Sequence, residues 1–344
     1  MKRLIDLGIL PIRRKSPRGY TPHLSILFRS DGQHLFGIDT SRTNGTMDSH
    51  VFLITHAHSD HYGNSAMLSQ KSVASEKTAK ALEIRYERKF AGTTFKIGEP
   101  INIDGVMVRT HPTGHTIGAT AFSWKNEVGT TILATGDVKD ASRLPKCDVL
   151  ITEANYGNPA DPQCRFEEEV DLFKEAIEED VAFGAYVFGK AQRAVELVRN
   201  FGYHDEIEME HKALELTRGL MDQVEPLVGL NGNMGGVIIV PPRDLYRLPK
   251  RFDKFVLTGQ RQYRHQQIRI SDHLDVDALT DMVKKCNPDV TIVYHPNGDN
   301  PIKFARYLDE NGFAAIALDD ITNVIDEMLT SGRKIKKPII KLRR

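Results

Sequence analysis

The stretch Thr55-His56-Ala57-His58-Ser59-Asp60-His61 places three histidines and one aspartate within six residues. It directly follows Val51-Phe52-Leu53-Ile54, a short apolar run without charge that predicts a buried strand. The cluster should therefore lie at the carboxyl end of a strand, where α/β proteins place their sites. Imidazole and carboxylate groups suit Zn²⁺ or a similar divalent ion. The alternative, a polar turn that is rich in histidine by chance, requires four matched positions.

Composition narrows the class of protein. The chain has 344 residues, enough for one large or two modest domains, with 46 acidic and 46 basic residues. There is no global basic charge of the kind that marks many nucleic-acid-binding proteins. Three widely spaced cysteines without a CxxC pair predict a reducing compartment and metal ligands other than thiolates. Because no apolar run approaches the ~20 residues of a spanning helix, we expect a soluble, cytoplasmic protein without a membrane partner.

Further candidate ligands follow other strand-like runs. Such runs end at Asp39, Asp137, Glu153 and His295, while His115 lies between two glycines in a loop after a strand. Because glycine lets the backbone approach a cluster closely, we prefer His115 to its competitor His111, which precedes a proline. Asp39 fits a group that orients a metal-binding histidine.

There are more candidate ligands than a single metal ion needs. They are His56, His58, Asp60, His61, His115, Asp137 and His295. Seven ligands suit two ions about 3.5–4 Å apart that share a bridging carboxylate, for which Asp137 is well placed. Glu153 and His273 lie outside this set, and a histidine oriented by a carboxylate is a suitable general acid. Two metal ions activate water, but a departing alkoxide still needs a proton, so this pair is the candidate donor.

The sequence between these positions predicts alternating elements. We expect a helix over 63–80, strands over 94–97 and 106–110 around the turn Asp104-Gly105, and a surface helix over 165–180. Further on we expect a strand over 186–188, helices over 191–201 and 206–223, and strands over 237–240 and 255–257. This alternation predicts a second α/β layer with parallel strands.

Taken together, the motifs resemble a known family. The cluster from His56 to His61 resembles the H-x-H-x-D-H signature of the metallo-β-lactamase superfamily. Asp39, that cluster, His115 and Asp137 match its four motifs in order, and the later segments are similar to the β-CASP nucleases. Glu153, His273 and His295 match motifs A, B and C of that branch. Residues 188–193 resemble its Gly-Arg-Ala-Gln element, with Lys190 in place of the usual arginine.

The resemblance implies a fold and a distribution of ligands. The fold is an αββα sandwich over 1–156 and 259–344, with a short β-CASP cap inserted at 157–258. It implies two zinc ions, with Mn²⁺ as the alternative metal. One ion is held by His56, His58, His115 and Asp137, and the other by Asp60, His61, Asp137 and His295. Asp60 is thus a ligand and, with Glu153 and His273, a catalytic residue.

The resemblance also implies a substrate. It predicts hydrolysis of phosphodiester bonds in single-stranded RNA, endo- or exonucleolytic, because a histidine at motif C is typical of the RNA-processing branch. If the site lies between sandwich and cap, Lys190, Arg193, Thr258 and Gly259 are placed to bind substrate phosphates. DNA as substrate, a small-molecule ester or thioester hydrolase, and a non-catalytic scaffolding subunit are the alternatives. A homodimer is compatible with all of them.

Overall fold

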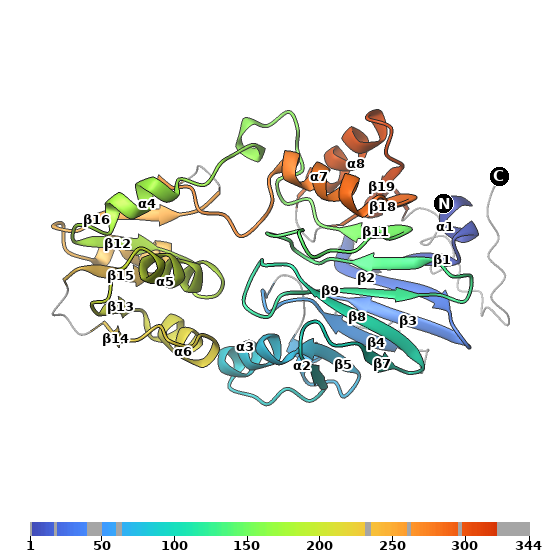
Figure 1. The fold of residues 1–344 in the computed structure, drawn as a ribbon, viewed down its shortest axis with the longest axis horizontal. Coiled ribbons are helices and arrows are strands. Elements are labelled where there is room, and N and C mark those ends of the chain that lie inside the picture. The colour runs from blue at the N-terminus through green and yellow to red at the C-terminus, as the bar shows by residue number, and fades with distance from the viewer. Residues whose placement is uncertain are drawn as a thin grey trace.

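The computed structural model describes residues 2–16, 19–39, 50–59, 64–230, 235–259, 263–294 and 298–321. Over these residues the chain forms three β-sheets with helices packed on them (Figure 1), which confirms the expected α/β class. None of the helices within these ranges is long and apolar enough to cross a bilayer.

The first sheet contains six strands in sequence order. They are β1 (Ile9–Ser16), β2 (Gly19–Arg29), β3 (Gln33–Ile38), β4 (His50–Ile54), β5 (Ser72–Ser75) and β6 (Thr93–Phe95). β1, β2 and β3 pair antiparallel, and β3 to β6 pair in parallel. The carboxyl ends of β3 and β4 therefore meet at one edge of the sheet.

The second sheet has the order β19-β18-β11-β10-β9-β8-β7. Its strands are β7 (Ile101–Ile103), β8 (Val106–Pro112), β9 (Thr120–Lys125), β10 (Thr131–Ala134), β11 (Val149–Thr152), β18 (Val290–Val293) and β19 (Ala315–Ala317). β10, β11, β18 and β19 run parallel, while β7 to β10 alternate in direction.

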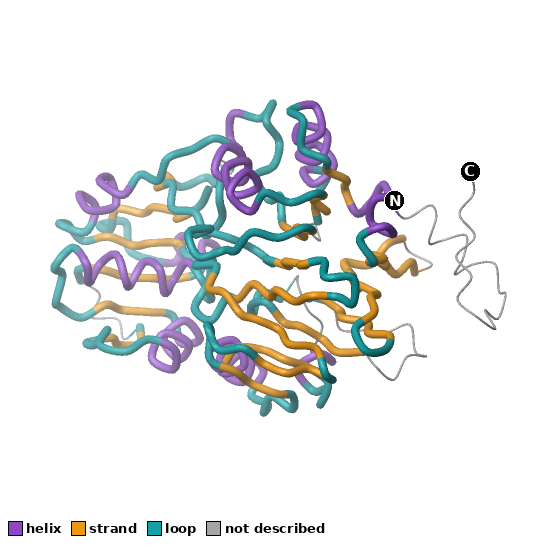
Figure 2. The backbone as a smooth tube through the Cα atoms, turned by 45° about the vertical axis from the view of Figure 1, so that its right-hand side comes forward, coloured by secondary structure: helices purple, strands orange, loops and turns teal. Residues whose placement is uncertain are grey.

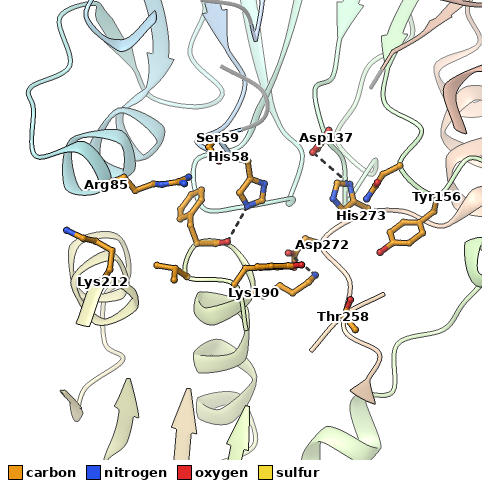
Figure 3. A pocket seen from close by; sticks show the side chains of 14 residues that line it. His58, Ser59, Arg85, Asp137, Tyr156, Lys190, Lys212, Thr258, Asp272 and His273 are labelled. Atoms are coloured by element: carbon orange, nitrogen blue, oxygen red, sulfur yellow. Dashed lines mark hydrogen bonds and ion pairs between the residues drawn. The ribbon is translucent and has the colours of Figure 1, made fainter. Parts of the chain in front are cut away.

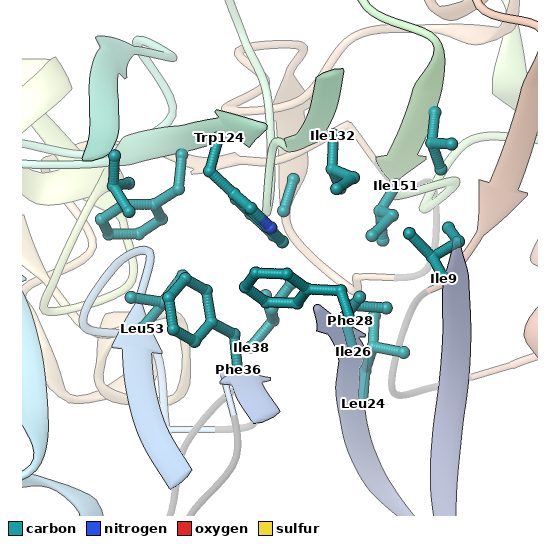
Figure 4. Packing of buried hydrophobic residues seen from close by; sticks show 14 of the residues in the cluster. Ile9, Leu24, Ile26, Phe28, Phe36, Ile38, Leu53, Trp124, Ile132 and Ile151 are labelled. Carbon is teal, nitrogen blue, oxygen red and sulfur yellow. The ribbon is translucent and has the colours of Figure 1, made fainter. Parts of the chain in front are cut away.

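These two sheets pack face to face through an aromatic core (Figure 4). The Phe28 and Phe36 rings of the first sheet lie 4.9 Å apart, edge to face, and the Trp124 ring of the second lies 5.3 Å from Phe36. Aliphatic side chains such as Leu53 and Ile132 surround the three rings and are fully buried. Large apolar side chains alternate inward from both sheets, so this core supplies much of the burial that stabilises the fold.

Helices cover the outer faces of both sheets. α2 (Asn64–Met67) and α3 (Glu76–Tyr86) pack on β4 and β5 through buried alanines and Leu82. α7 (Val276–Cys286) and α8 (Asn300–Glu310) pack on the second sheet, where Met282 and Phe304 are buried. The layers are therefore helix, sheet, sheet and helix. A short helix, α1 (Lys2–Asp6), precedes β1.

The third sheet lies at the other end of the long axis (Figures 1 and 2). Its six parallel strands have the order β14 (Leu227–Gly229), β13 (Ile207–Met209), β15 (Val237–Val240), β12 (Val181–Gly184), β16 (Asp253–Leu257) and β17 (Gln266–Ile268). The expected parallel layer is thus present. The division of the chain at 157 and 258 stays a prediction, and β17 extends this sheet beyond residue 258.

α5 (Lys190–Asn200), α6 (His211–Leu220) and the 3₁₀ turn η2 (Pro242–Arg247) connect strands of the third sheet. The 3₁₀ turn η1 (Pro162–Cys164) and α4 (Val170–Ala176) lie in the segment that leads from β11 to its first strand, β12. α6 packs against α3 of the sheet pair, where Leu216 and Leu220 join the cluster that also contains Leu82. This contact fixes the third sheet beside the first.

Several local expectations were wrong. The stretch 63–80 contains strand β5 between two helices, because Ser75 ends the strand and its hydroxyl accepts the Thr78 backbone N–H that begins α3. The hairpin at Asp104-Gly105 pairs β7 with β8, whereas 93–95 belongs to the first sheet. In both cases long-range strand pairing decided what local patterns left ambiguous.

Segments of the third sheet were also misplaced. Residues 186–188 form the turn before α5, and the strand is Val181–Gly184, a run that is buried throughout. The segment 206–223 begins with buried strand β13, and the Glu210 carboxylate caps α6 by accepting backbone N–H groups. The expected helix over 165–180 is limited to α4. Strands buried on both faces lack the alternation that marks a strand in sequence.

The aromatic core gives a stability prediction. Phe36→Ala should lower the free energy of unfolding by about 3–5 kcal/mol, because the cavity between the sheets cannot close. Val128→Ala, at a side chain that is 62% exposed, should change it by less than about 0.5 kcal/mol. Equilibrium urea denaturation measures both values, and equal losses would show that the inter-sheet core does not hold the fold.

Candidate metal centre

The candidate site lies at the carboxyl ends of strands from both packed sheets. Asp39 follows β3, His56 and His58 follow β4, Asp137 follows β10, and Glu153 follows β11. Gly136, just before Asp137, has a φ of +60° and lies against the Thr55 side chain. A side chain at 136 would collide with Thr55, so glycine lets the two sheet edges meet here.

A buried relay orients His56. Asp39 accepts the Thr55 backbone N–H at 2.8 Å and the Thr55 hydroxyl at 2.6 Å. The Thr55 oxygen lies 2.9 Å from Nδ1 of His56. Because the hydroxyl proton goes to the carboxylate, the oxygen accepts from Nδ1–H, and Nε2 keeps its lone pair. That nitrogen lies 3.6 Å from Oδ2 of Asp137.

Backbone carbonyls orient the other two histidines in the same manner. Nε2 of His58 donates to the Phe188 carbonyl at 3.2 Å, and Nδ1 of His115 donates to the Asp272 carbonyl at 2.7 Å. A carbonyl oxygen only accepts, so the opposite ring nitrogens carry lone pairs when the rings are neutral. These nitrogens, Nδ1 of His58 and Nε2 of His115, lie 3.0 Å apart.

The donor set fits a divalent metal ion. Ligand atoms of His56, His58, His115 and Asp137 all lie within 4.8 Å of one another. Around tetrahedral Zn²⁺, with bonds of about 2.0–2.1 Å, neighbouring ligand atoms are roughly 3.3–3.4 Å apart. Three of the six separations here, His58–His115, His115–Asp137 and His56–Asp137, are 3.0, 3.4 and 3.6 Å. Converging lone pairs repel one another unless a cation lies between them, so these four residues could hold a metal ion.

The charge state of His115 agrees with this role. Burial lowers the pKa of His115 well below its ordinary value, and the neighbouring His273 lowers it further. The ring is therefore neutral at physiological pH, as a metal ligand must be.

Next to the cluster of three histidines and Asp137 lies the pair of Glu153 and His273. Asp137 is close to both. Nδ1 of His273 lies 2.9 Å from each oxygen of Glu153, whose carboxylate also accepts the Val138 N–H at 2.8 Å. Burial by itself lowers the pKa of His273, but the carboxylates of Glu153, Asp137 and Asp272 together outweigh burial, and the pKa is raised above its ordinary value. His273 can thus hold a proton near neutral pH, with Nδ1 facing Glu153 and Nε2 left for the cavity.

A cavity of about 720 Å³ opens over these groups (Figure 3). We call it the central cavity. Its lining residues are His58, Ser59, Arg85, Asp137, Asn155, Tyr156, Tyr186, Val187, Phe188, Lys190, Lys212, Thr258, Asp272 and His273. They come from the two packed sheets, from α3, and from segments of the third sheet. The cavity is therefore a cleft between those parts of the molecule.

Sequence reasoning missed several of these side chains. Arg85 lies on α3, donates to the Ala57 carbonyl and faces the ring of Phe188 at 6.0 Å. Lys212 reaches the cavity from α6. Neither stands in a motif, and only the packing of α3 on α6 brings them to the cavity. Asp272 carried one signal, since it directly precedes His273.

The predicted phosphate-binding residues fall in different places. Lys190 and Thr258 line the central cavity, but Nζ of Lys190 forms a buried ion pair with Oδ2 of Asp272 at 3.0 Å. Arg193 lines a separate hollow and pairs with Glu196 at 2.8 Å. Gly259 is buried against Tyr156. His111 lies on β8 and contacts Ser123, away from the cluster. Asp60, His61 and His295 lie outside the described residues.

The ion pair between Lys190 and Asp272 helps to orient His115 in the candidate metal cluster. Burial by itself raises the pKa of Asp272, but Lys190 and the nearby histidines hold it below its usual value. Because the Asp272 carbonyl accepts from His115, the pair anchors the segment that orients this ring. Gly189, with φ of +90°, lets the start of α5 approach His58. A Cβ at this position would lie 3.2 Å from the His58 ring.

Comparison with known proteins addresses the fold alone. No protein-family model matches this chain, and no curated protein matches its sequence. Many solved structures share the fold. One is a crystal structure of a protein of unknown function from Enterococcus faecalis V583, with a TM-score of 0.62 and 12% sequence identity. The match covers 90% of this chain and 97% of the other.

The relay through Thr55 can be tested by metal binding. Thr55→Val keeps the size of the side chain but removes the hydroxyl that holds Nδ1 of His56. Zinc affinity should fall by about 10–100-fold, as for other groups that orient a ligand. Thr110→Val, a buried hydroxyl bonded to the Glu99 carbonyl, is the matched control and should bind zinc normally. Competition with a chromophoric chelator measures both affinities; unchanged binding by Thr55→Val would refute the relay.

The Lys190–Asp272 pair gives a second prediction. Lys190→Ala should lower the free energy of unfolding by about 3–5 kcal/mol, because it leaves a buried carboxylate without its counter-charge. Arg193→Ala, which removes a cation on the same helix from a surface pair, should cost less than about 1 kcal/mol. Chemical denaturation compares the two variants. Similar losses would mean that the buried pair has no special weight.

Proposed function

We propose that this chain is a zinc-dependent hydrolase of phosphodiester bonds that acts on single-stranded RNA. The observation that carries the proposal is the cluster of three oriented imidazoles and Asp137, next to a protonatable His273, in one cavity. We further propose that it belongs to the β-CASP branch of the metallo-β-lactamase superfamily. The sequence motifs support this, as do the four layers and the separate parallel sheet.

His56, His58, His115 and Asp137 would hold one ion. A divalent ion in this position supplies Lewis-acid activation of water and of a phosphoryl oxygen. The ligands proposed for a second ion, Asp60, His61 and His295, lie outside the described residues, and only Asp137 of that set is described. Asp137 lies between the histidine cluster and the Glu153–His273 pair, the position that a shared ligand needs.

His273 is proposed to donate the proton that the leaving oxygen requires. Glu153 accepts from Nδ1, which fixes the tautomer of the ring and leaves Nε2 to face the substrate. The backbone N–H of Val138 and that of Asn155 hold the carboxylate in place. Because these contacts are made before substrate arrives, the proton donor is already positioned when the bond breaks.

Positive side chains support a phosphodiester over a neutral substrate. Arg85 and Lys212 line the cavity together with Tyr156, Tyr186 and Phe188, whereas the charge of Lys190 is offset by Asp272. Cations favour phosphate, and aromatic rings favour bases, which is the combination used for single-stranded nucleic acids. A small-molecule esterase needs neither. The choice of RNA over DNA is drawn from the resemblance at His295.

His273→Ala tests the catalytic assignment. Wild-type protein loaded with zinc should cleave end-labelled single-stranded RNA faster than matched DNA. The variant should keep its metal and its RNA affinity, while kcat falls by roughly 10²–10⁴-fold through loss of the general acid. A nitrophenyl phosphodiester, whose leaving group needs no proton, should recover part of the loss. Loss of metal would make His273 a ligand, and wild-type rates would remove it from the mechanism.

The pH profile gives an independent readout. Because His273 must be protonated and its pKa is raised, activity should decline only as pH rises through that raised value. Glu153→Gln removes the negative charge that raises the pKa, so the alkaline decline should move to lower pH. If the alkaline decline stays at the same pH in Glu153→Gln, the charge of Glu153 does not set the pKa of His273.

A further inference from the structure

The segment 265–269 presents three side chains to a groove. His265, Gln267 and Arg269 are half-buried and line it, whereas Arg264 and Gln266 are exposed. Successive side chains of a strand point to opposite sides, so Gln267 lies on the other side of β17 from Gln266 and the buried Ile268. β17, within this segment, is the last strand of its sheet, so the groove lies along an edge.

The groove is a cavity of about 350 Å³, here called the β17 groove. It is lined by Glu169, Thr258, His265, Gln267 and Arg269. Oε2 of Glu169 accepts the Arg269 backbone N–H at 2.7 Å, so this carboxylate is used to hold the end of the strand. The Arg269 guanidinium lies 6.0 Å from the Phe166 ring, which supports it as a fixed cation.

The β17 groove adjoins the central cavity. Thr258 lines both (Figure 3 shows it at the edge of the central cavity). A second link comes from Tyr263, whose hydroxyl lies 2.7 Å from that of Tyr186, a residue of the central cavity. A ligand that extends from the central cavity past Thr258 therefore enters the β17 groove.

The groove offers the groups that recognise a nucleotide. Arg269 can bind phosphate, the Gln267 amide can bond base edges or ribose hydroxyls, and the His265 imidazole provides a stacking surface. We propose that the β17 groove binds nucleotides flanking the scissile phosphate, so that the preferred substrate is a single-stranded RNA long enough to span both cavities. This inference rests on the proposed function, and it goes beyond it by placing part of the substrate on β17.

Neighbouring glutamines provide a matched test. Gln267→Glu puts a negative charge into the groove, while Gln266→Glu puts the same charge at an exposed position on the opposite side of the strand. Binding is measured by fluorescence anisotropy on zinc-loaded full-length chain with a phosphorothioate single-stranded RNA of about 10 nucleotides, which resists hydrolysis. Gln267→Glu should weaken this binding by about tenfold through repulsion of phosphate. Gln266→Glu should leave it within twofold of wild type, by ~0.4 kcal/mol or less.

Two arginines provide a second matched pair. Arg269→Ala should weaken binding and reduce the slope of log affinity against log salt concentration by about 0.7, the value for one phosphate contact on a single strand. Arg264→Ala, which removes the same charge from an exposed position outside the groove, should leave the slope unchanged. A labelled dinucleotide, too short to reach the groove, should bind wild type and Arg269→Ala alike.

The outcomes separate this inference from the proposed function. If the groove variants and their controls weaken RNA binding equally, the charge acts generally and the β17 groove is no subsite. The β17 groove is also no subsite if wild type binds the longer RNA no better than the dinucleotide. In that case, cleavage of a short phosphodiester would still support the proposed function. If wild type neither binds RNA nor cleaves any phosphodiester, both proposals fail.

Discussion

The candidate site depends on three imidazole rings whose orientation is fixed by hydrogen bonds. In each ring, the nitrogen that faces away from the cluster donates to an oxygen atom of the protein. His56 is held by the Thr55–Asp39 relay, His58 by the Phe188 carbonyl and His115 by the Asp272 carbonyl. Each acceptor fixes a tautomer, and the three remaining lone pairs face the same point as Asp137. Such a concentration of lone pairs is costly in an empty pocket, so the scaffold must hold it against electrostatic repulsion.

Two of these acceptors belong to segments near the third sheet. Phe188 precedes α5, and Asp272 follows β17 and forms the ion pair with Lys190 at the start of α5. His58 and His115, two candidate metal ligands of the packed sheets, are therefore oriented by residues from across the cleft. The contact of α3 with α6 makes a second junction between the same parts. Any shift of the third sheet should thus alter the ligand geometry, and metal binding should in turn stabilise its position.

Strand direction explains why so many polar groups collect at one place. β3 and β4 of the first sheet are parallel, as are β10 and β11 of the second. Their carboxyl ends carry Asp39, His56, Asp137 and Glu153. Backbone and side chains are free to leave the sheet there, while the aromatic core behind remains closed to water. The structure thus separates an apolar interior from a polar edge that holds the candidate site.

The amino-acid sequence by itself determined the α/β class and most strands that end in a functional group. Apolar runs followed by His, Asp or Glu are local patterns, and His56, His115, Asp137, Glu153 and His273 could be read from them. The prediction of His273 as partner of Glu153 relied on their chemistry, and the structure brings the two within 2.9 Å. Asp60, His61 and His295 stay predictions because they lie outside the described residues.

Tertiary structure alone decided which residues surround that chemistry. Lys190 was predicted as a phosphate ligand, but it forms an ion pair with the buried Asp272. Arg193, on the same helix, lines a different hollow. β5 and β13 are strands because neighbouring strands pair with them, although their local sequences also suit helices. Arg85, Lys212 and the β17 groove arise where segments far apart in sequence meet. Local sequence encodes the period and end of an element, whereas pairing and burial depend on partners that only folding brings near.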